Sequence, residues 1–247
     1  YSADNQLTAE TVYTGVDADG ALAGSAPSGG LTTTYVYDSR ARLRFVVDAA
    51  GAVQEYEYDT SGNGIGQLSK TRRYLGAAYT GARTLTDLSN WATPAQRAQS
   101  TLTASSYDLK GRLSGTWSYA TVDASGNGVE NDAAEIVQYL YNAQGLLTQR
   151  RVMRSSTAAV DDGRDVSQTT TYLYDGMNRL LSEVVTEKTG AAAEQLKRTV
   201  TAWIYQDSGA SVRTIVEGGL SSNDGIASND LVRVEVRNQA GVVILVS

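Results

Sequence analysis

Short runs of alternating apolar and polar residues recur along the chain and are separated by polar turns. Leu31 to Tyr37 and Gln168 to Tyr174 are two such runs, each rich in Thr and Tyr. Successive side chains of a strand point to opposite faces, so the alternation places Tyr35 and Tyr37 on one face and Val36 on the other. Thr, Tyr and Val also favour strands. The pattern therefore predicts an all-β fold made of antiparallel β-hairpins.

One phrase marks the turn of each predicted hairpin. Its clearest copy is Tyr-Asp-Leu-Lys-Gly-Arg-Leu at residues 107–113. Copies of varying quality begin at Tyr1, Tyr37, Tyr58, Tyr107, Tyr141, Tyr174 and Tyr205, and Val236 stands at a last, weak copy. Self-similarity of this kind predicts a repeat protein. We therefore expect one hairpin array over residues 1–247, and no linker is long enough to divide it.

The residue types of the phrase predict how each turn is built. Asp at the first turn position accepts hydrogen bonds from the following backbone, and Gly at the fourth position adopts positive φ. Asp108 to Gly111 and Asp59 to Gly62 have both residues. The same spacing occurs without a preceding Tyr at Asp48 to Gly51 and Asp123 to Gly126.

Several copies lack the glycine, among them those that contain Asn178 and Ala41. Asn178 tolerates the left-handed conformation that Gly otherwise adopts. A left-handed alanine costs roughly 1 kcal/mol, so the turn that contains Ala41 is expected to differ from the others.

The hairpins are joined by variable stretches. Residues 14–30, 122–134, 158–165 and 218–230 are rich in Gly, Asp, Asn and Ser and are predicted to be surface loops. An insertion at about 76–104 holds Thr93 followed by Pro94, which is typical of a helix N-cap and first helical residue, so one short helix is expected there. Residues 191–197 fit either a brief helix or a strand–loop–strand connection.

Composition excludes several classes of function. The net charge of −6 argues against nucleic-acid binding, and we expect Arg72 and Arg73 to pair with acids or lie along the sheet. Histidine is absent, so no Ser-His-Asp triad or His-based zinc site can form. Cysteine is absent too. No run of about 18 apolar residues is present to span a membrane. The first residue is Tyr, and we expect any signal peptide to lie outside this sequence.

The phrase Tyr-x-Tyr-Asp-x-x-Gly-Arg-Leu resembles the signature of the YD-repeat, or Rhs, family. Tyr35 to Leu43, Asp48 to Gly51 and Tyr56 to Asp59 together resemble one nearly complete unit, 21 residues from Tyr37 to Tyr58. The residues assigned to the repeated structural motif are Tyr35, Tyr37, Asp38, Tyr56, Tyr58, Asp59, Gly62, Tyr107, Asp108, Gly111, Tyr139, Tyr141, Gly145, Tyr172, Tyr174, Asp175, Asn178 and Tyr205.

The resemblance implies a ribbon of hairpins winding into a shell, tube or solenoid-like sheet. The family includes bacterial Rhs toxins, cage-forming components of insecticidal toxin complexes and the shells of teneurins. Rhs and toxin-complex cages usually end in a self-cleaving region marked by Asp-Pro-x-Gly. The only prolines here are Pro27 and Pro94, and neither follows Asp. We therefore expect the self-cleaving region and any toxin cargo to lie outside this sequence.

Alternative roles compete at two groups of residues. The tyrosine rows fit either a sugar-binding surface or, as we favour, rings that stack on one another across neighbouring strands. Acidic loops suggest calcium, although solvated turns are favoured because no convergent ligand spacing is present. These loop residues are Asp17, Asp19, Asp123, Asn127, Glu130, Asp132, Asn223, Asp224, Asn229 and Asp230. Adjacent carboxylates such as Asp161 and Asp162 are able in principle to do acid–base work, but they sit in a Gly-rich loop with no aromatic cleft nearby to shape a substrate, so catalysis there is not favoured.

We expect a structural segment of a secreted or surface-exposed bacterial YD-repeat protein, which forms a shell, tube or filament by strand pairing between successive segments. No catalytic, metal or cofactor site is assigned. Expected partners are neighbouring repeats of the parent chain or identical subunits, with glycans or an enclosed toxin cargo as alternatives. The competing functions are a cell-surface adhesin or carbohydrate-binding module and, third, a polysaccharide-acting enzyme.

Overall fold

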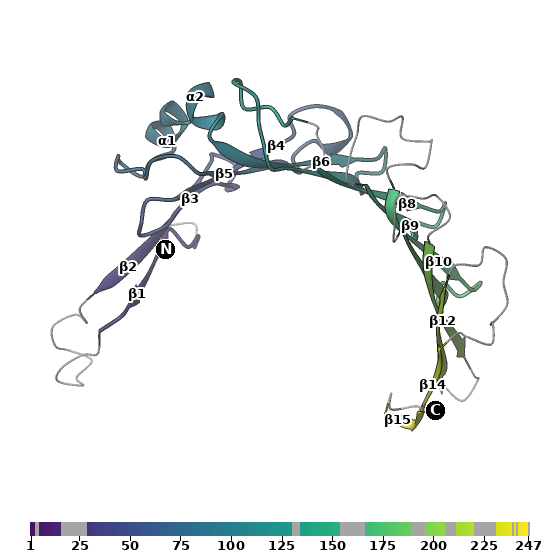
Figure 1. Cartoon of the computed structure of the whole chain (residues 1–247). Helices are drawn as coiled ribbons and strands as arrows, with labels where there is room; N and C mark the ends of the chain where they lie inside the picture. Colours follow the sequence, from purple (N-terminus) through teal and green to yellow (C-terminus); the bar gives the residue numbers. More distant parts are fainter. Residues whose placement is uncertain are drawn as a thin grey trace. The chain divides into compact units, whose positions relative to one another are not determined.

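The computed structural model describes residues 1–2, 5–15, 29–129, 134–153, 166–188, 196–205, 211–219, 231–238, 240 and 242–246 (Figure 1). Contacts within the chain group into two compact units, unit 1 from Tyr1 to Ala134 and unit 2 from Glu135 to Ser247, and each unit is described by itself. Loop residues 158–165 and 191–195 lie outside the described residues.

Unit 1 is an antiparallel sheet in which each described strand pairs with the next one along the chain. Its strands are β1 (Ala9–Tyr13), β2 (Gly30–Tyr37), β3 (Leu43–Val47), β4 (Val53–Tyr58), β5 (Leu68–Tyr74), β6 (Ser100–Tyr107) and β7 (Leu113–Tyr119). A single 3₁₀ turn, η1 (Gly62–Gly64), lies between β4 and β5.

Unit 2 repeats this arrangement. Its strands are β8 (Glu135–Tyr141), β9 (Leu147–Met153), β10 (Val166–Tyr174), β11 (Leu180–Lys188), β12 (Leu196–Tyr205), β13 (Ser211–Gly219), β14 (Leu231–Arg237) and β15 (Val243–Val246). The predicted all-β array of antiparallel hairpins is therefore confirmed in both units.

A β-bulge sits at the same place in the hairpins built on the phrase. The register shifts at the tyrosine that precedes the turn, so Tyr37 pairs with Leu43, and Tyr107 pairs with Leu113. The same shift occurs at Tyr58, Tyr141 and Tyr174. A bulge beside a turn that ends in a left-handed residue is a common way for a hairpin to keep its twist.

Connections in unit 1 alternate between the two ends of the strands because neighbouring strands run in opposite directions. The turns of the repeated phrase, at 38–42, 59–67 and 108–112, lie at one end of the strands, which we call the turn end. The opposite end of the strands, the insertion end, carries the turn at 48–52 and the insertion between Tyr74 and Ser100. The connections at the insertion end differ in length, and this difference accounts for much of the unequal spacing of the repeats.

The insertion forms two short helices where the sequence predicted one. These are α1 (Leu85–Trp91) and α2 (Pro94–Arg97). Thr84 and Thr93 are their N-caps, and each hydroxyl accepts a hydrogen bond from the backbone three residues on. The insertion ends earlier than the expected boundary of about 104, because β6 already begins at Ser100.

The helices cover one face of the unit 1 sheet and enclose its core. Figure 1 shows both beside β3 and β5, and α1 contacts β3 while α2 contacts β5. Leu88 of α1 is fully buried in a cluster with Phe45, Val47 and Val53. The ring centroid of Trp91 lies 4.7 Å from that of Tyr74. This insertion gives a sheet of half-buried residues a second layer to pack against.

No helix among the described residues has the length and apolar character needed to cross a membrane.

We expect the Leu88→Ala variant to lower the free energy of unfolding by about 2–5 kcal/mol, because it leaves a cavity in this core. Leu109→Ala is the matched control, since Leu109 is 91% exposed and its truncation should change stability by less than about 0.5 kcal/mol. Urea unfolding followed by tryptophan fluorescence measures the transition, and Trp91 is the tryptophan that packs against this core. Equal effects of the two substitutions would show that α1 is not part of the core.

Candidate functional site

The turn of the repeated phrase is closed by its first residue. Asp108 Oδ1 accepts hydrogen bonds from the backbone N–H groups of Lys110 and Arg112, at 2.8 and 2.9 Å. Gly111 has φ 72° and donates its N–H to the carbonyl of Asp108. The same side-chain and backbone bonds occur in the turns that begin at Asp38, Asp48, Asp123 and Asp175. The predicted Asx-type turn is therefore present at these positions.

The arginine of the phrase is held by the same aspartate. Arg112 Nε and Nη2 lie 2.7 and 2.6 Å from Asp108 Oδ2. Arg42 contacts Asp38 in the same way. The hydrogen bonds from Arg112, first from its side chain and then from its backbone, lower the pKa of the Asp108 carboxyl. Asp175 with Arg179 repeats the arrangement. The aspartate thus fixes both the turn and the direction of the arginine.

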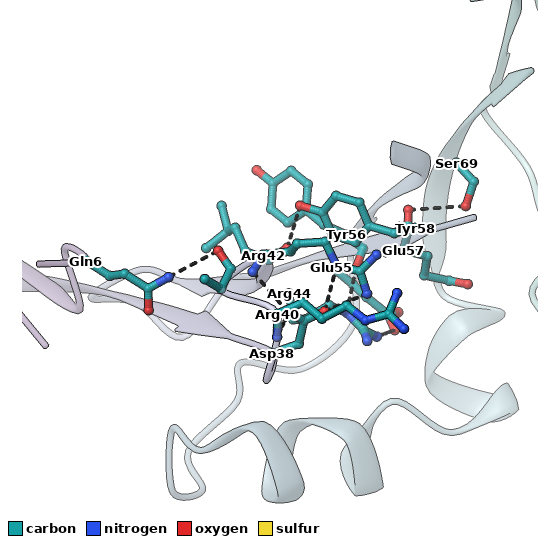
Figure 2. Close-up of polar contacts among 12 residues, drawn as sticks. Gln6, Asp38, Arg40, Arg42, Arg44, Glu55, Tyr56, Glu57, Tyr58 and Ser69 are labelled. Atoms are coloured by element: carbon teal, nitrogen blue, oxygen red, sulfur yellow. Dashed lines mark hydrogen bonds and ion pairs between the residues drawn. The ribbon is translucent and has the colours of Figure 1, made fainter. Parts of the chain in front are cut away.

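The tyrosine that precedes each turn reaches back to the hairpin before it. Its hydroxyl donates to the backbone carbonyl of the residue at the leucine position of the preceding phrase. The bonds are Tyr37 to Leu7 at 3.0 Å, Tyr58 to Leu43 at 2.9 Å, Tyr107 to Leu68 at 2.7 Å, Tyr174 to Leu147 at 2.9 Å and Tyr205 to Leu180 at 2.8 Å. Figure 2 shows the Tyr58 bond. We call each of these bonds a tyrosine link.

The position before the leucine reinforces the tyrosine link. The guanidinium carbon of Arg42 lies 4.4 Å from the ring centroid of Tyr58 in the next phrase. Arg179 lies over Tyr205 at the same distance. Such cation–π contacts contribute about 0.5–1 kcal/mol at exposed sites. The aspartate, arginine and tyrosine of successive phrases therefore form one connected contact between neighbouring hairpins.

Two copies have glutamine in place of this arginine, and they reach the same neighbour differently. The side-chain amide of Gln67 donates to the carbonyl of Gly111, 2.7 Å away in the next turn. Gln6 donates to the carbonyl of Ala41 at 3.1 Å, as Figure 2 shows. Arginine contacts the next tyrosine ring, whereas glutamine contacts the next turn. The side chain at this position contacts the following hairpin in all four cases.

Two turns differ from what the sequence predicted for them. Asp59 to Gly62 does not close a four-residue turn, because the loop runs to Gln67 and Gly66 donates to the carbonyl of Asp59. Both Gly62 and Gly66 have positive φ, at 73° and 81°, which lets the chain form η1 before it turns back. In contrast, the turn with Ala41 keeps the common geometry at φ 63°.

The last copy is displaced by one residue from the sequence assignment. Asn238 accepts from the N–H groups of Ala240 and Val242, and Arg237 pairs with Val243 across the bulge. Arg237, rather than Val236, therefore stands at the tyrosine position. Asn142 closes the Gly145 turn in the same manner as Asn238, and Asn178 has φ 64°.

The five tyrosines of the links contact a backbone carbonyl, where the sequence predicted another tyrosine ring. The other tyrosines of the phrase lie two residues earlier on the strands. Tyr35, Tyr56, Tyr139 and Tyr172 are all partly buried. Tyr35 donates to Glu10 Oε2 at 3.3 Å. Tyr141 also pairs with Leu147 at its own bulge.

The predicted alternative sites are only partly described. Asp123 and Asn127 bond to each other within one turn, at 3.2 Å between the amide nitrogen and Asp123 Oδ2. The other residues considered for calcium, and the pair Asp161 and Asp162, lie outside the described residues. Within the described ranges no group of three acidic residues could hold a metal ion.

Sequence reasoning missed a buried polar cluster centred on Glu55. This side chain of β4 is 1% exposed and accepts hydrogen bonds from Tyr74 at 2.6 Å and from Arg97 at 2.7 Å. Burial and then the bond to Glu55 raise the pKa of the Tyr74 hydroxyl. Burial lowers the pKa of Arg97, but its bond to Glu55 outweighs this effect and raises it overall. The signal in the sequence was a glutamate at an inward-facing strand position.

We expect the Tyr58→Phe variant to lose about 0.5–1.5 kcal/mol of unfolding free energy, because it removes a tyrosine link and leaves the Leu43 carbonyl without its donor. Tyr56→Phe is the matched control: it lies on the same strand and face, and no hydrogen bond of its hydroxyl is found among the described residues. Urea unfolding of both variants measures the difference. A cost as large for Tyr56 as for Tyr58 would refute the tyrosine link.

We expect the Asp108→Asn variant to flatten the dependence of stability on pH. The pKa of Asp108 is lower in the folded chain, so its contribution is present above the unfolded value of about 3.9 and is lost as pH falls through the folded value. Asn keeps the turn acceptor, as Asn142 shows, but does not titrate. Urea unfolding between about pH 7 and pH 3 tests this, with Arg112→Gln as a companion that should act in the same direction. Unchanged acid sensitivity in both variants would contradict the assignment.

No protein-family profile matches the sequence, and no curated protein matches it. Several solved structures are similar to it, including the following two. One is described as "Crystal Structure of TcdB2-TccC3-Cdc42", with 17% identity and a TM-score of 0.43 over 88% of this chain and 10% of that chain. The other is "Crystal Structure of TcdB2-TccC3-TEV", with 15% identity and a TM-score of 0.20 over 87% of this chain and 16% of that chain. This chain thus spans a small fraction of these toxin-complex chains, and at these identities and scores the similarity extends to no activity or partner.

Proposed function

We propose that this chain is a structural segment of a secreted bacterial YD-repeat protein, in which successive hairpins build the wall of a shell, tube or filament. The observation that carries the proposal is the tyrosine link. In five described pairs of hairpins the hydroxyl of the tyrosine is used for a bond to the preceding hairpin. The most regular residues of the sequence therefore serve cohesion between repeats.

The same observation weighs against the competing roles. A sugar-binding tyrosine needs an open ring face, yet Tyr58 and Tyr205 are each covered by an arginine of the preceding phrase. Catalysis needs convergent groups beside a substrate. The aspartates and arginines of the phrase are instead paired with each other within their turns. A non-catalytic, ligand-independent role remains the simplest one for these residues.

Strand addition is the way in which we propose that such a segment continues. Among the described residues β15 pairs only with β14, so its outer edge offers unpaired backbone groups. The next segment of the parent chain, or a second copy, would pair there. The exposed side chains of Val242 and Val243 lie where this strand begins.

We expect the Ile244→Lys variant to reduce concentration-dependent self-association of the chain, because a charge on an edge strand opposes further pairing. Leu109→Lys carries the same charge change on a turn of unit 1 and is the control. Size-exclusion chromatography with light scattering measures the mass. A monomer at all concentrations for the unmodified chain would exclude pairing between copies.

A glycan panel tests the structural role against the adhesin alternative. The structural role predicts that no glycan raises the unfolding temperature, whereas a specific ligand stabilises in proportion to its occupancy. A saturable rise that Tyr56→Phe abolishes would replace the structural role with carbohydrate binding.

A further inference from the structure

One buried carboxylate faces three guanidinium groups in unit 1. Arg97 Nη2 lies 2.7 Å from Glu55 Oε1, and Arg44 Nη2 lies 3.9 Å from the same oxygen. Arg72 Nε lies 3.8 Å from Oε2. Arginine stays protonated at ordinary pH, so with Glu55 ionised this group carries two more positive charges than negative ones.

The cluster also has more donors than acceptors. The Arg72 side chain is only 3% exposed, and its Nε–H has no hydrogen-bond acceptor in the part of the chain that the structure describes, although its Nη1 donates to Ser100 Oγ at 2.9 Å. The buried Nε–H of Arg97 likewise has no acceptor among the described residues. Buried donors without partners are rare in native structures, and each calls for an explanation.

Neighbouring residues do not supply the missing negative charge. Glu57 lies two residues beyond Glu55 on the same face of β4, where it stands opposite Lys70 in register. Glu57 lies close enough to Arg97 to help raise the pKa of that guanidinium, but Lys70 opposite it offsets the negative charge that it adds. The Tyr74 hydroxyl donates to Glu55 and its oxygen also accepts from Arg97, but a neutral phenol adds no negative charge. With Glu57 and Lys70 included, four positive and two negative charges remain, so the excess of two positive charges persists among these described residues.

Two of the three arginines of this cluster are partly exposed to solvent. The side chains of Arg44 and Arg97 are 26% and 32% exposed, and they approach the same oxygen of Glu55 from β3 and from α2. Figure 2 shows Arg44 beside Glu55, with the Arg44 Nε–H donating to the carbonyl of Tyr56 at 2.8 Å. Guanidinium groups bind planar and tetrahedral oxyanions through paired N–H groups.

We propose that the rim formed by Arg44 and Arg97 binds a dianionic phosphate group, either free or as the monoester of a small molecule. A dianion matches the excess of two positive charges, whereas a second carboxylate would neutralise half of it. The bound group would bridge β3 and α2 and so tie the helical insertion to the sheet. This site is separate from the tyrosine links and does not depend on the proposed structural role.

The test is thermal unfolding of the full chain in increasing inorganic phosphate at about pH 8, where phosphate is dianionic, against sodium chloride at matched ionic strength. We expect a saturable rise in unfolding temperature with phosphate alone. Arg44→Gln should weaken the apparent affinity by about tenfold or more, because it removes one of the two guanidinium groups of the rim. Arg73→Gln is the matched control, since Arg73 is the exposed neighbour of Arg72 and points to the opposite face of β5.

A second arm identifies the source of the phosphate. Glucose 6-phosphate with glucose as its control separates a phosphorylated sugar from free phosphate, according to which one binds more tightly. If far-UV circular dichroism shows that Arg44→Gln does not fold, Arg44→Lys keeps the charge without the fork and should still bind more weakly than the unmodified chain. No saturable rise, unchanged affinity in the folded Arg44 variant, or an equal loss in Arg73→Gln would overturn the proposal.

Discussion

The bond from a tyrosine hydroxyl to the backbone of the preceding hairpin is the interaction on which the array depends. The hydrogen-bond ladder of a sheet pairs any two strands and does not by itself choose their register. The tyrosine link does choose it, because Tyr58 can reach the Leu43 carbonyl in one alignment only. Four of the five link tyrosines stand at a bulge, Tyr205 being the exception, and these bulges position the hydroxyls for the same purpose.

Packing on the faces of the sheet follows a second rule. In unit 1 the residue between Tyr35 and Tyr37, Val36, is buried in the core that includes Leu88 of α1. In unit 2 the residues at the corresponding positions are Leu140, Leu173 and Ile204, and they are 45%, 58% and 61% exposed. The repeated phrase therefore specifies how hairpins are joined, whereas the burial of the opposite face depends on an insertion that the phrase does not encode.

Much of the fold could be predicted from the sequence because the turn is a local structure. Asp108 and Gly111 suffice to specify its hydrogen bonds, and the alternation around Val36 specifies the faces. The longer loop after Asp59 could not be read in the same way, since Gly62 and Gly66 both adopt positive φ and only the three-dimensional structure decides between two turn positions.

The candidate sites were harder to predict because they join residues that are distant in sequence. The tyrosine of each link bonds a carbonyl at least 15 residues away, a partner that no local pattern identifies. Ala41 was expected to alter its turn, yet its backbone is left-handed at φ 63° and is held by the bonds of Asp38 on either side. Likewise, Glu55 reads as one more polar residue of a strand until Arg97, far along the chain, lies against it.

Because the connections alternate between the two ends of the strands, the chain can lengthen at one end without altering the other. At the insertion end of unit 1, opposite the tyrosine links, strands of the same sheet are joined both by a tight turn at Asp48 and by an insertion with two helices. Residues inserted into a connection at the insertion end leave every tyrosine link at the turn end in place. New domains can thus be inserted at the insertion end, by evolution or by protein engineering, while the turn end keeps the spacing of the hairpins constant.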